Sequence, residues 1–384
     1  MKFIPYNRQY IDNQDIRIVS KALKQNLITT GEYVKKFENQ IKKYLKSKFA
    51  ISCSSGSAGL HLALKAINIK KGDKVVMPAI NFIAAYSICK NLGAKIFLAD
   101  VDPLTGQMTP DTLKECIKKN NLKKIKAIVT MYLGGYPENI FEFYKIKKKY
   151  KCFLIEDACH AFGASYIFKN KKIFIGSCKH SDLAIFSFHP VKSITTGEGG
   201  VITANNKILT NKILLLRSHG IERKKNKHWE YNINKFGFNY RLSDINCALG
   251  LSQLKKIKKI IIYRSRIYKN YYQFFLNNDE VILPEYTKKN NSAFHLFLIS
   301  LKRNNKIIKE KLFNYLKKNK ILAQYHYIPI YRFSVFGKKI SYNKFPNSEY
   351  YFNNNLSLPL FYGLNLKKQN YILEKLSLFF KKLK

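Results

Sequence analysis

The sequence predicts an α/β fold, in which a large domain is built on a mostly parallel sheet of seven strands and a smaller α+β domain follows it. Short β-rich runs alternate with amphipathic segments from residue 49 to residue 204, and this pattern ends beyond residue 250. The 384 residues are enough for two domains of roughly 150 residues or more. We therefore expect an amino-terminal arm and the large domain over residues 1–250, and the small domain over residues 251–384.

The individual elements follow from the spacing of apolar residues. The seven strands are expected at 49–53, 74–80, 94–102, 125–133, 152–158, 182–188 and 199–204. Helical spacing lies between them, as in LHLALKAI, IAAYSICKNLG and NIFEFYKIKKKY. Farther along the chain, helices are expected at 242–275, 306–320 and 370–384, and strands at 292–301 and 321–331. Strands that alternate with helices in this way favour a parallel sheet with helices on both faces.

Composition narrows the class of protein. The net charge is +45, yet only nine of the 69 basic residues are Arg, the residue on which readers of nucleic acid most depend. The lysines are spread over the whole chain, which favours a solvated lysine surface and no nucleic-acid partner, with a nucleic-acid-binding protein kept as a remote alternative. No apolar run is long enough to span a membrane and the first residues are polar, so we expect a cytoplasmic protein without membrane insertion.

The seven cysteines form no CxxC pair, which predicts reduced thiols and no metal site.

Polar clusters follow four of the predicted strands, at 54–57, 81–82, 156–157 and 189–192. Because ligands of parallel sheets bind at the carboxyl ends of the strands, these clusters mark the expected site. Lys192 is delivered there by the run AIFSFHPVK and is followed by small, hydroxylated and glycine-rich residues. A lysine in this setting is a candidate for a covalent bond to an aldehyde cofactor such as pyridoxal 5'-phosphate (PLP).

PLP needs further groups, and the sequence offers a candidate for each. Asp157 could pair with the ring nitrogen, the turn at 56–58 could present backbone N–H groups to the phosphate, and Phe82 could stack on the ring. Each has an ordinary alternative, since Asp157 could cap a helix or face solvent, the small residues could form a plain turn, and Phe82 could pack in the core. His160 and His189 could equally be core or capping residues.

Several ordered motifs resemble the DegT/DnrJ/EryC1/StrS family of sugar aminotransferases, which are PLP enzymes of fold type I. They are SSGSAGLHLA, FLIEDACHAFGA, FSFHPVKSITTGEGG, RSHGI and GFNYRLSDINCALGLSQL, and the resemblance runs from NLITTGEYVKKFE near residue 30 to LSLPLF near residue 358. A related branch that dehydrates sugars has histidine in place of the lysine, so Lys192 favours transamination.

Within the family, FSFHPVK, ITTGEGG, Tyr6 and AQYHYIPIY are most similar to enzymes of pseudaminic acid biosynthesis that aminate C4 of UDP-4-keto-6-deoxy-N-acetylhexosamines. The resemblance implies a UDP-keto-sugar acceptor, L-glutamate as the donor and a homodimer with shared active sites. Amination at C3, or of a dTDP- or GDP-linked sugar, is the alternative within the same fold.

The resemblance also implies a role for each matched residue. Lys192 would bind the cofactor covalently and move a proton, while Asp157 would hold the ring nitrogen. The other implied cofactor-binding residues are Ser57, Ala58, Phe82, His160, Ser187 and, from the other subunit, Asn239. The residues implied to contact the nucleotide-sugar are Tyr6, Asn26, Leu27, Ile28, Thr29, Ser57, Ser187, His326 and Tyr327.

Overall fold

A seven-stranded sheet forms the centre of the molecule, and the computed structural model describes residues 3–224, 226–302, 306–337 and 341–383. All seven predicted strands belong to this sheet: β1 (Phe49–Cys53), β2 (Lys74–Pro78), β3 (Lys95–Ala99), β4 (Ala127–Met131), β5 (Phe153–Asp157), β8 (Leu183–Ser187) and β9 (Gly200–Ala204). Their order is β1-β9-β8-β5-β4-β2-β3.

The sheet is mostly parallel, as predicted. Only β9 is antiparallel to its neighbours, β1 and β8, while β8, β5, β4, β2 and β3 pair in parallel. Because β1 and β8 both run opposite to β9, they share one direction. The carboxyl ends of β1, β2, β5 and β8 therefore meet at one edge of the sheet, where the polar clusters of the sequence were expected to gather.

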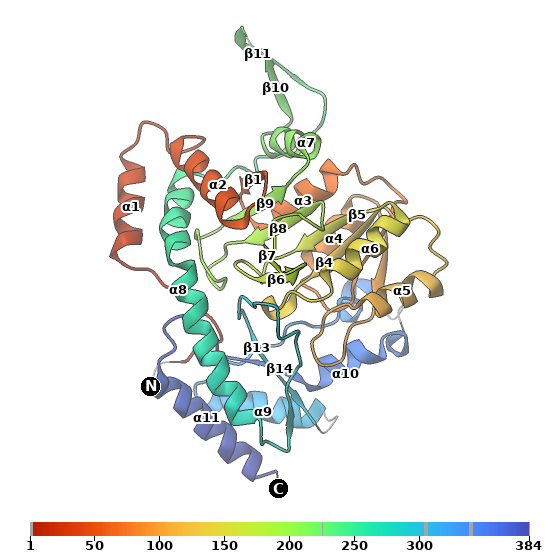
Figure 1. Cartoon of the computed structure of the whole chain (residues 1–384), viewed down its shortest axis with the longest axis vertical. Helices are drawn as coiled ribbons and strands as arrows, with labels where there is room; N and C mark the ends of the chain where they lie inside the picture. The colour runs from red at the N-terminus through yellow and green to blue at the C-terminus, as the bar shows by residue number, and fades with distance from the viewer. Residues whose placement is uncertain (1–2, 225, 303–305, 338–340, 384) are drawn as a thin grey trace.

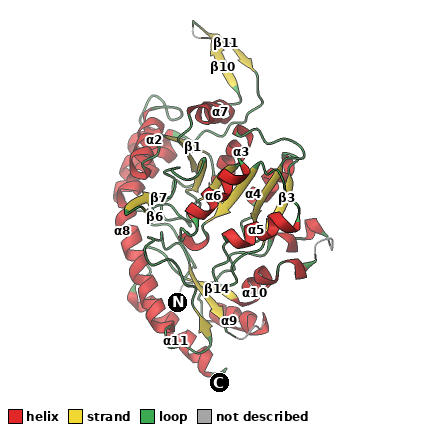
Figure 2. Ribbon diagram, turned by 45° about the vertical axis from the view of Figure 1, so that its right-hand side comes forward, coloured by secondary structure: helices red, strands yellow, loops and turns green. Residues whose placement is uncertain are grey.

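Helices cover both faces of the sheet (Figures 1 and 2). One face carries α3 (Gly56–Ala66), α4 (Ala84–Asn91) and α7 (Lys207–Arg217), and the other carries α2 (Glu32–Leu45), α5 (Pro110–Lys119) and α6 (Ile140–Tyr150). Alternation along the strands explains the two layers. Val75 of β2 packs with Leu64 of α3, whereas its neighbour Val76 packs with Leu113 of α5.

The long helix α8 (Asp244–Phe275) contributes to two apolar clusters. Leu254 and Ile257, in its first half, pack with α2, whereas Tyr271 and Phe275 pack in the core of the carboxyl-terminal part. Helix α1 (Asn13–Leu23) lies along α8 (Figure 1). The predicted boundary at residue 250 falls inside α8, and the division into two domains stays a proposal with α8 shared between them.

The carboxyl-terminal part has a small antiparallel sheet with helices packed on it. Its strands are β12 (Val281–Ile282), β13 (Phe297–Leu301) and β14 (Asn355–Leu358), and its helices are α9 (Lys306–Lys318), α10 (Pro346–Asn354) and α11 (Leu366–Lys381). The amino-terminal arm joins this part, since Ile4 is buried there and exchanges backbone hydrogen bonds with Lys320 and Leu322.

Two strand predictions in this part need correction. Residues 321–331 form only isolated bridges, Ile4 with Ile321 and Gln324 with Ser357, before a 3-10 helix over Ile330–Arg332. Pro329 has no N–H to donate, so the segment cannot continue as a strand. Residues 292–296 precede β13 as irregular chain, because their backbone groups bond to the turn at Gly134 and Gly135 instead of a strand.

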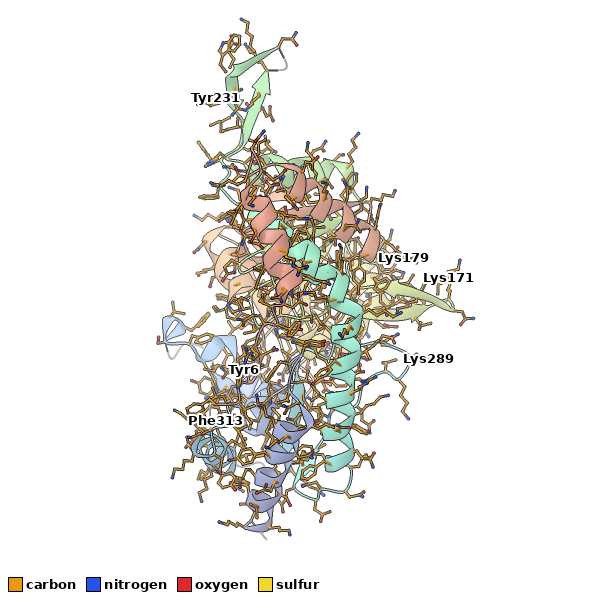
Figure 3. All side chains as sticks on the ribbon, turned by 90° about the vertical axis from the view of Figure 1, so that its left-hand side faces the viewer. Tyr6, Lys171, Lys179, Tyr231, Lys289 and Phe313 are labelled. Carbon is orange, nitrogen blue, oxygen red and sulfur yellow. The ribbon has the colours of Figure 1, made fainter. Side chains whose placement is uncertain are left out.

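Two hairpins were missed by the sequence analysis. They pair β6 (Ser165–Phe168) with β7 (Lys171–Phe174), and β10 (Ile221–Lys224) with β11 (Lys227–Ile233). The second hairpin projects from the body of the molecule, with Tyr231 on it, while Lys171, Lys179 and Lys289 point away from the body (Figure 3). Strands β6, β7 and β10 have only four residues each, too few to show an alternation, whereas β11 alternates Trp229, Tyr231 and Ile233 with polar residues and could have been predicted.

All seven cysteines are free thiols, and six of them are buried. Within the described ranges, no helix has the length and apolar character required to cross a membrane.

Candidate active site

The start of α3 is pressed against the ends of β5 and β8. A Cβ atom at Gly56 would lie 3.0 Å from the Cβ of Ser187 and 3.2 Å from the Sγ of Cys159, so a larger residue would force these segments apart. Ser187 is the last residue of β8, and Cys159 follows Asp157 at the end of β5. The glycine therefore lets the polar cluster at 54–57 lie directly against the ends of β5 and β8, next to the clusters at 156–157 and 189–192.

Lys192 and Asp157 are two charged groups at this edge of the sheet. We call the group of residues around them the cleft. Asp157 is 4% exposed, and burial raises its pKa, although the Cys159 N–H, which donates at 3.3 Å, and the charge of Lys192 oppose the shift. Desolvation lowers the pKa of Lys192, while Cys159 and Asp157 raise it. Each group is thus shifted toward its neutral form by the removal of water.

The first turn of α3 presents backbone N–H groups at this edge. Ser55 caps the helix, and its side chain accepts a hydrogen bond from the Ala58 N–H at 3.0 Å. The N–H groups of Gly56 and Ser57 come before the helical hydrogen-bond ladder and have no acceptor within it. Together with the helix dipole they form a site suited to a phosphate. Ser57 is exposed, whereas Ala58 is buried and its N–H is already engaged.

Phe82 stands at the end of β2 with its ring in the open. It is 53% exposed, so the core-packing alternative for this residue is wrong, and its ring lies 5.9 Å from that of Tyr327. Asn81 beside it is 1% exposed, and neither atom of its side-chain amide has a partner among the described residues. A buried amide left unpaired costs about 1–3 kcal/mol, which indicates a site made for a ligand with polar groups.

Three histidines and a tyrosine close the cleft. The rings of His160 and His295 lie 4.1 Å apart, and the ring of His326 lies 6.2 Å from that of His160. His160 Nδ1 accepts from the Gly134 N–H at 3.4 Å, and its Nε2 is 3.0 Å from the Tyr327 hydroxyl. No set of three or more His, Cys, Asp or Glu in the described chain has the arrangement of a metal site.

The other predicted site residues fall into two groups. Tyr6 joins the cleft, since its ring lies 5.4 Å from that of His326. The segment Asn26, Leu27, Ile28 and Thr29 is exposed beside the start of α8, where the Asp244 N–H donates to Ile28 O at 2.9 Å. Asn239 is also exposed and bridges to Ser218. His189 caps its own loop, since its Nδ1 accepts from the Val191 N–H at 3.4 Å.

Comparison with protein families decides the affiliation. The model of the DegT/DnrJ/EryC1/StrS aminotransferase family matches residues 9–377. The chain belongs to this family.

Individual relatives agree with the family assignment. A protein of Campylobacter jejuni subsp. jejuni strain 81-176, named UDP-4-amino-4,6-dideoxy-N-acetyl-beta-L-altrosamine transaminase, is 37% identical over 385 residues, which cover 99% of this chain and 98% of that protein. The structure of Helicobacter pylori PseC, an aminotransferase of pseudaminic acid biosynthesis, has a TM-score of 0.88 at 28% identity and covers 99% of this chain and 100% of its own.

A third relative bears on the cofactor. Spr1654 of Streptococcus pneumoniae, assigned as a sugar aminotransferase, has a TM-score of 0.91 at 25% identity in its pyridoxamine phosphate form, with 99% of this chain and 100% of that chain covered. The same protein has also been solved in its PLP form. These findings indicate pyridoxal phosphate as the cofactor of this DegT/DnrJ/EryC1/StrS member.

The residues of the cleft fit that cofactor. The open N–H groups of α3 suit its phosphate, the exposed ring of Phe82 suits its aromatic face, and the buried carboxylate of Asp157 suits a protonated ring nitrogen. Asn81, next to Phe82 in the sequence, has a buried amide without a partner among the described residues.

Arg264 and His295 lie at the site but were not predicted, whereas Ser55 and Asn81 were predicted only as members of the polar clusters at 54–57 and 81–82. Asn81 carried a signal, since it lies in the polar cluster after the second strand. His295 stood in a segment interpreted as a strand, and Arg264 in the middle of a long helix, so neither position indicated a site.

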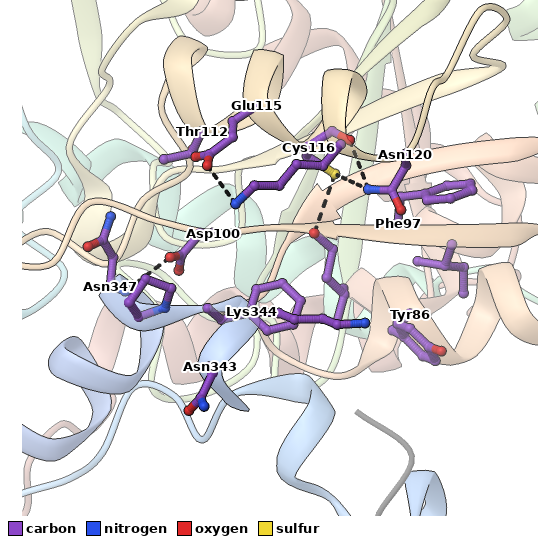
Figure 4. Close-up of a pocket in the computed structure, with 15 residues that line it drawn as sticks. Tyr86, Phe97, Asp100, Thr112, Glu115, Cys116, Asn120, Asn343, Lys344 and Asn347 are labelled. Atoms are coloured by element: carbon purple, nitrogen blue, oxygen red, sulfur yellow. Dashed lines mark hydrogen bonds and ion pairs between the residues drawn. The ribbon is translucent and has the colours of Figure 1, made fainter. Parts of the chain in front are cut away.

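A separate cavity lies away from these residues. Its volume is about 600 Å³, and it lies between β3, α5 and residues 343–347 (Figure 4). Three of its charged groups have partners, because Lys119 binds Glu115 at 2.6 Å and Asp100 accepts from the N–H groups of Asn347 and Ser348. None of the predicted site residues lines it.

Proposed function

We propose that the chain is a PLP-dependent aminotransferase that moves the amino group of L-glutamate to C4 of a UDP-4-keto-6-deoxy-N-acetylhexosamine, in a pathway of the pseudaminic acid type. The observation that carries the proposal is the interaction of the Lys192 charge with the buried Asp157 carboxyl, at the edge of the sheet where Phe82 exposes its ring. The names of the Campylobacter and Helicobacter relatives support this choice of acceptor.

Lys192 would perform the proton transfers. PLP, when bound, would supply an acceptor for the electron pair that remains when a proton leaves carbon. Amination then needs one base that takes a proton from the donor's carbon and later returns one to C4 of the sugar. Because burial lowers the pKa of Lys192, its amine gives up its proton more readily than an exposed lysine does.

The other groups would bind and orient. Asp157 would keep the ring nitrogen protonated, Phe82 would stack on the ring, and the N–H groups of Gly56 and Ser57 with the Ser187 hydroxyl would hold the phosphate. Ala58 would support this turn through its bond to Ser55. His160 would lie beside the ring hydroxyl, and Tyr6, His326 and Tyr327 would contact the sugar nucleotide.

The exposed predicted residues would serve a partner copy. Segment 26–29 and Asn239 lie outside the cleft of their own chain, which is consistent with a homodimer in which Asn239 reaches the partner's cofactor. Apolar side chains are exposed on the same segments: Leu27 is 63% exposed, Ile28 43%, Phe236 83% and Phe238 47%. Burial of such groups is the usual driving force of dimer formation.

Two measurements test the proposal. The purified protein should bind PLP, and borohydride reduction followed by proteolysis should place the pyridoxyl group on the peptide that contains Lys192. The matched variant Lys207→Ala, at an exposed residue of α7, should give the same labelled peptide, whereas Lys192→Ala should give none. A label on another lysine would refute the assigned role.

The acceptor is tested with a panel of keto-sugars. UDP-4-keto-, UDP-3-keto-, dTDP-linked and GDP-linked sugars are each incubated with L-glutamate, and the position of the new amine is determined by NMR. We expect amination of the UDP-4-keto-sugar at C4 with formation of 2-oxoglutarate. Faster amination of a 3-keto, dTDP- or GDP-linked sugar would instead support the alternative acceptor within the family. The donor is tested by replacing glutamate with aspartate or glutamine.

A further inference from the structure

Arg264 of α8 is a buried cation that the proposed mechanism does not use. Its side chain is 1% exposed, and no Asp or Glu in the described part of the chain pairs with it. It donates instead to neutral acceptors, at 3.0 Å to Asn7 Oδ1 and at 3.4 Å to Phe294 O, and its NH1 group lies 3.5 Å from His295 Nδ1. Burial of a cation without an anionic partner costs folding free energy, so the position of Arg264 beside His295 is expected to have a function.

A guanidinium group can only donate hydrogen bonds, which fixes the tautomer of its neighbour. Burial lowers the pKa of Arg264 to about 10, which still leaves it protonated near neutral pH. His295 Nδ1 must therefore be the acceptor, and its hydrogen must lie on Nε2. The same argument holds for His160, because its Nδ1 faces the Gly134 N–H at 3.4 Å, and a backbone N–H also only donates.

Gly134 links the two histidines. Its N–H donates to His160, while its carbonyl accepts from the His295 N–H at 2.9 Å. The two imidazole rings lie 4.1 Å apart. Arg264, His295, Gly134 and His160 thus form one continuous set of contacts from α8 to the cleft.

The set ends at Tyr327. With its hydrogen on Nε2, His160 donates to the Tyr327 hydroxyl at 3.0 Å, and the hydroxyl proton is left to point elsewhere. Burial raises the pKa of Tyr327, so the hydroxyl keeps its proton. The ring of Tyr327 lies 5.9 Å from that of Phe82, so Tyr327 belongs to the cleft.

The charges that face His160 from all sides keep it neutral. Burial lowers its pKa well below the usual range, and Lys192, His295, His326 and Arg264 act in the same direction. His295 is shifted likewise by burial, Lys192, Arg264 and His326. Asp157 faces Tyr327 and raises the pKa of that phenol further.

We infer that Arg264 is a positioning residue that, together with the Gly134 N–H, fixes His295 and His160 as neutral imidazoles protonated on Nε2, so that Tyr327 donates its hydroxyl proton to an oxygen of the bound ligand. This inference rests on the proposed function only for the identity of that ligand. The acceptor is an oxygen atom of either the cofactor or the keto-sugar, and the two sources are separated below.

Imidazole tautomers can be read directly by NMR. In protein labelled with 15N-histidine, which has eight histidines, the signals of His160 and His295 are assigned with His160→Gln and His295→Gln. We expect both rings in the Nε2–H form and no titration between about pH 5.5 and 8.5, with or without cofactor. Protonation of either ring on Nδ1, or a titration of either in this range, would overturn the inference.

Variants of Arg264 show whether it is the cause. Arg264→Met keeps the bulk but removes charge and donors, and part of the His295 population should then carry its hydrogen on Nδ1. Arg264→Lys keeps a cation and a donor, and should restore the native signals. His180→Gln is the control, since His180 is also buried but bonds to Tyr166 at 2.5 Å, outside the cleft. Unchanged histidine signals in Arg264→Met would contradict the assigned role.

Kinetics give a second readout. In Arg264→Met, kcat should fall by about tenfold, whereas Arg264→Lys should stay near the native value, because His295, whose ring lies 4.1 Å from that of His160, loses the donor that fixes its tautomer. The double variant Arg264→Met/Tyr327→Phe should show no loss beyond that of Tyr327→Phe, because both changes remove the same donor. Additive losses would show that Arg264 acts independently of Tyr327.

Tyr327→Phe also identifies the acceptor. A raised Kd for PLP places the acceptor oxygen on the cofactor, while a raised KM for the keto-sugar at unchanged PLP affinity places it on the sugar. A variant in which neither quantity changes would refute the donor role. The NMR measurement needs no substrate, so its result stands even where the panel of keto-sugars points to another acceptor.

Discussion

Asp157 is a buried carboxyl whose charge is only partly stabilised by its neighbours. Burial therefore raises its pKa. A protonated ring nitrogen would remove this penalty. The buried carboxyl of Asp157 is thus suited to pairing with a cation, as the proposed function requires.

Replacement of Asp157 by Asn tests this. The amide keeps the shape but cannot stabilise a buried cation, and we expect kcat to fall by about 100-fold or more. The PLP absorbance band should shift as well. Asp182→Asn is the control, because Asp182 precedes β8 at the opposite edge of the sheet and pairs with Lys147 at 2.7 Å. The Asp182→Asn variant should lose stability but keep the native kcat. A near-native kcat in Asp157→Asn would contradict the role assigned to Asp157.

Lys309 shows a second effect of burial, away from the cleft. Its side chain is 1% exposed, and its amine lies 4.1 Å from the ring centre of Tyr325 and 4.4 Å from that of Phe352. Burial lowers its pKa to about 8, whereas a lysine of the unfolded chain has a pKa near 10.4. Between these values the unfolded chain binds the proton more tightly, so this group makes stability rise with pH.

We therefore expect a pH-dependent difference between the native protein and Lys309→Met. From about pH 7.5 to about pH 10, the free energy of unfolding of the native protein should gain about 2 kcal/mol relative to the variant. Urea titrations at several pH values measure this. Lys311→Met, at an exposed position of the same helix, should show no such gain. An equal pH dependence in native protein and Lys309→Met would disprove the assigned pKa shift.

At the scale of elements, the turn over Leu133–Gly135 connects the large sheet to the His295 segment. Gly134 and Gly135 have φ values of 73° and 90°, and Gly135 O accepts from Ala293 N–H and from the Ser292 hydroxyl. A Cβ at Gly135 would lie 2.6 Å from the carbonyl oxygen of His160. Only glycine fits a turn that combines this backbone conformation with so close an approach.

The variant Gly135→Ala should accordingly lose more stability than Gly72→Ala. Gly72 has a similar φ of 86°, yet nothing lies within 4 Å of its Cβ position. Gly72→Ala should cost about 1 kcal/mol for the left-handed conformation alone, and Gly135→Ala about 1–3 kcal/mol more, with loss of activity. Urea denaturation and the aminotransferase assay give both numbers, and equal costs would show that the contact with His160 relaxes freely.

How much could be predicted from sequence also differs between elements. The seven strands of the large sheet were found because their buried β-rich runs are bounded by polar clusters, and Asp157, Phe82 and Lys192 follow directly from those ends. The segment 321–331 has the same apolar character but bonds to two different partners, Ile4 and Ser357, which no local pattern reveals. Arg264 and His295 meet only through tertiary packing, so their contact could not be predicted.

The whole molecule carries exposed apolar surface that a partner copy would cover. Phe236 is 83% exposed and lies just after the projecting β10–β11 hairpin, close to Asn239 in sequence. Val335, at 84%, is equally exposed but belongs to the carboxyl-terminal part. The proposed dimer, with Asn239 at the partner's site, would bury Phe236 and leave Val335 exposed.

Substitution of these two residues tests the dimer. Phe236→Ser should raise the dimer dissociation constant by about tenfold, because an aromatic side chain at the centre of an interface is worth about 1–2 kcal/mol. Val335→Ser should leave it unchanged. Sedimentation equilibrium measures both, and a native protein that is monomeric at micromolar concentration would refute the homodimer.

Helix α8 has a consequence for motion. It is one uninterrupted helix of 32 residues, about 48 Å long, anchored at one end beside segment 26–29 and at the other in the core around Phe275. A hinge between the two halves of the protein would have to break it. Entry of substrate and departure of product should therefore depend on movements of the surface loops, while the large sheet and α8 keep their relative positions.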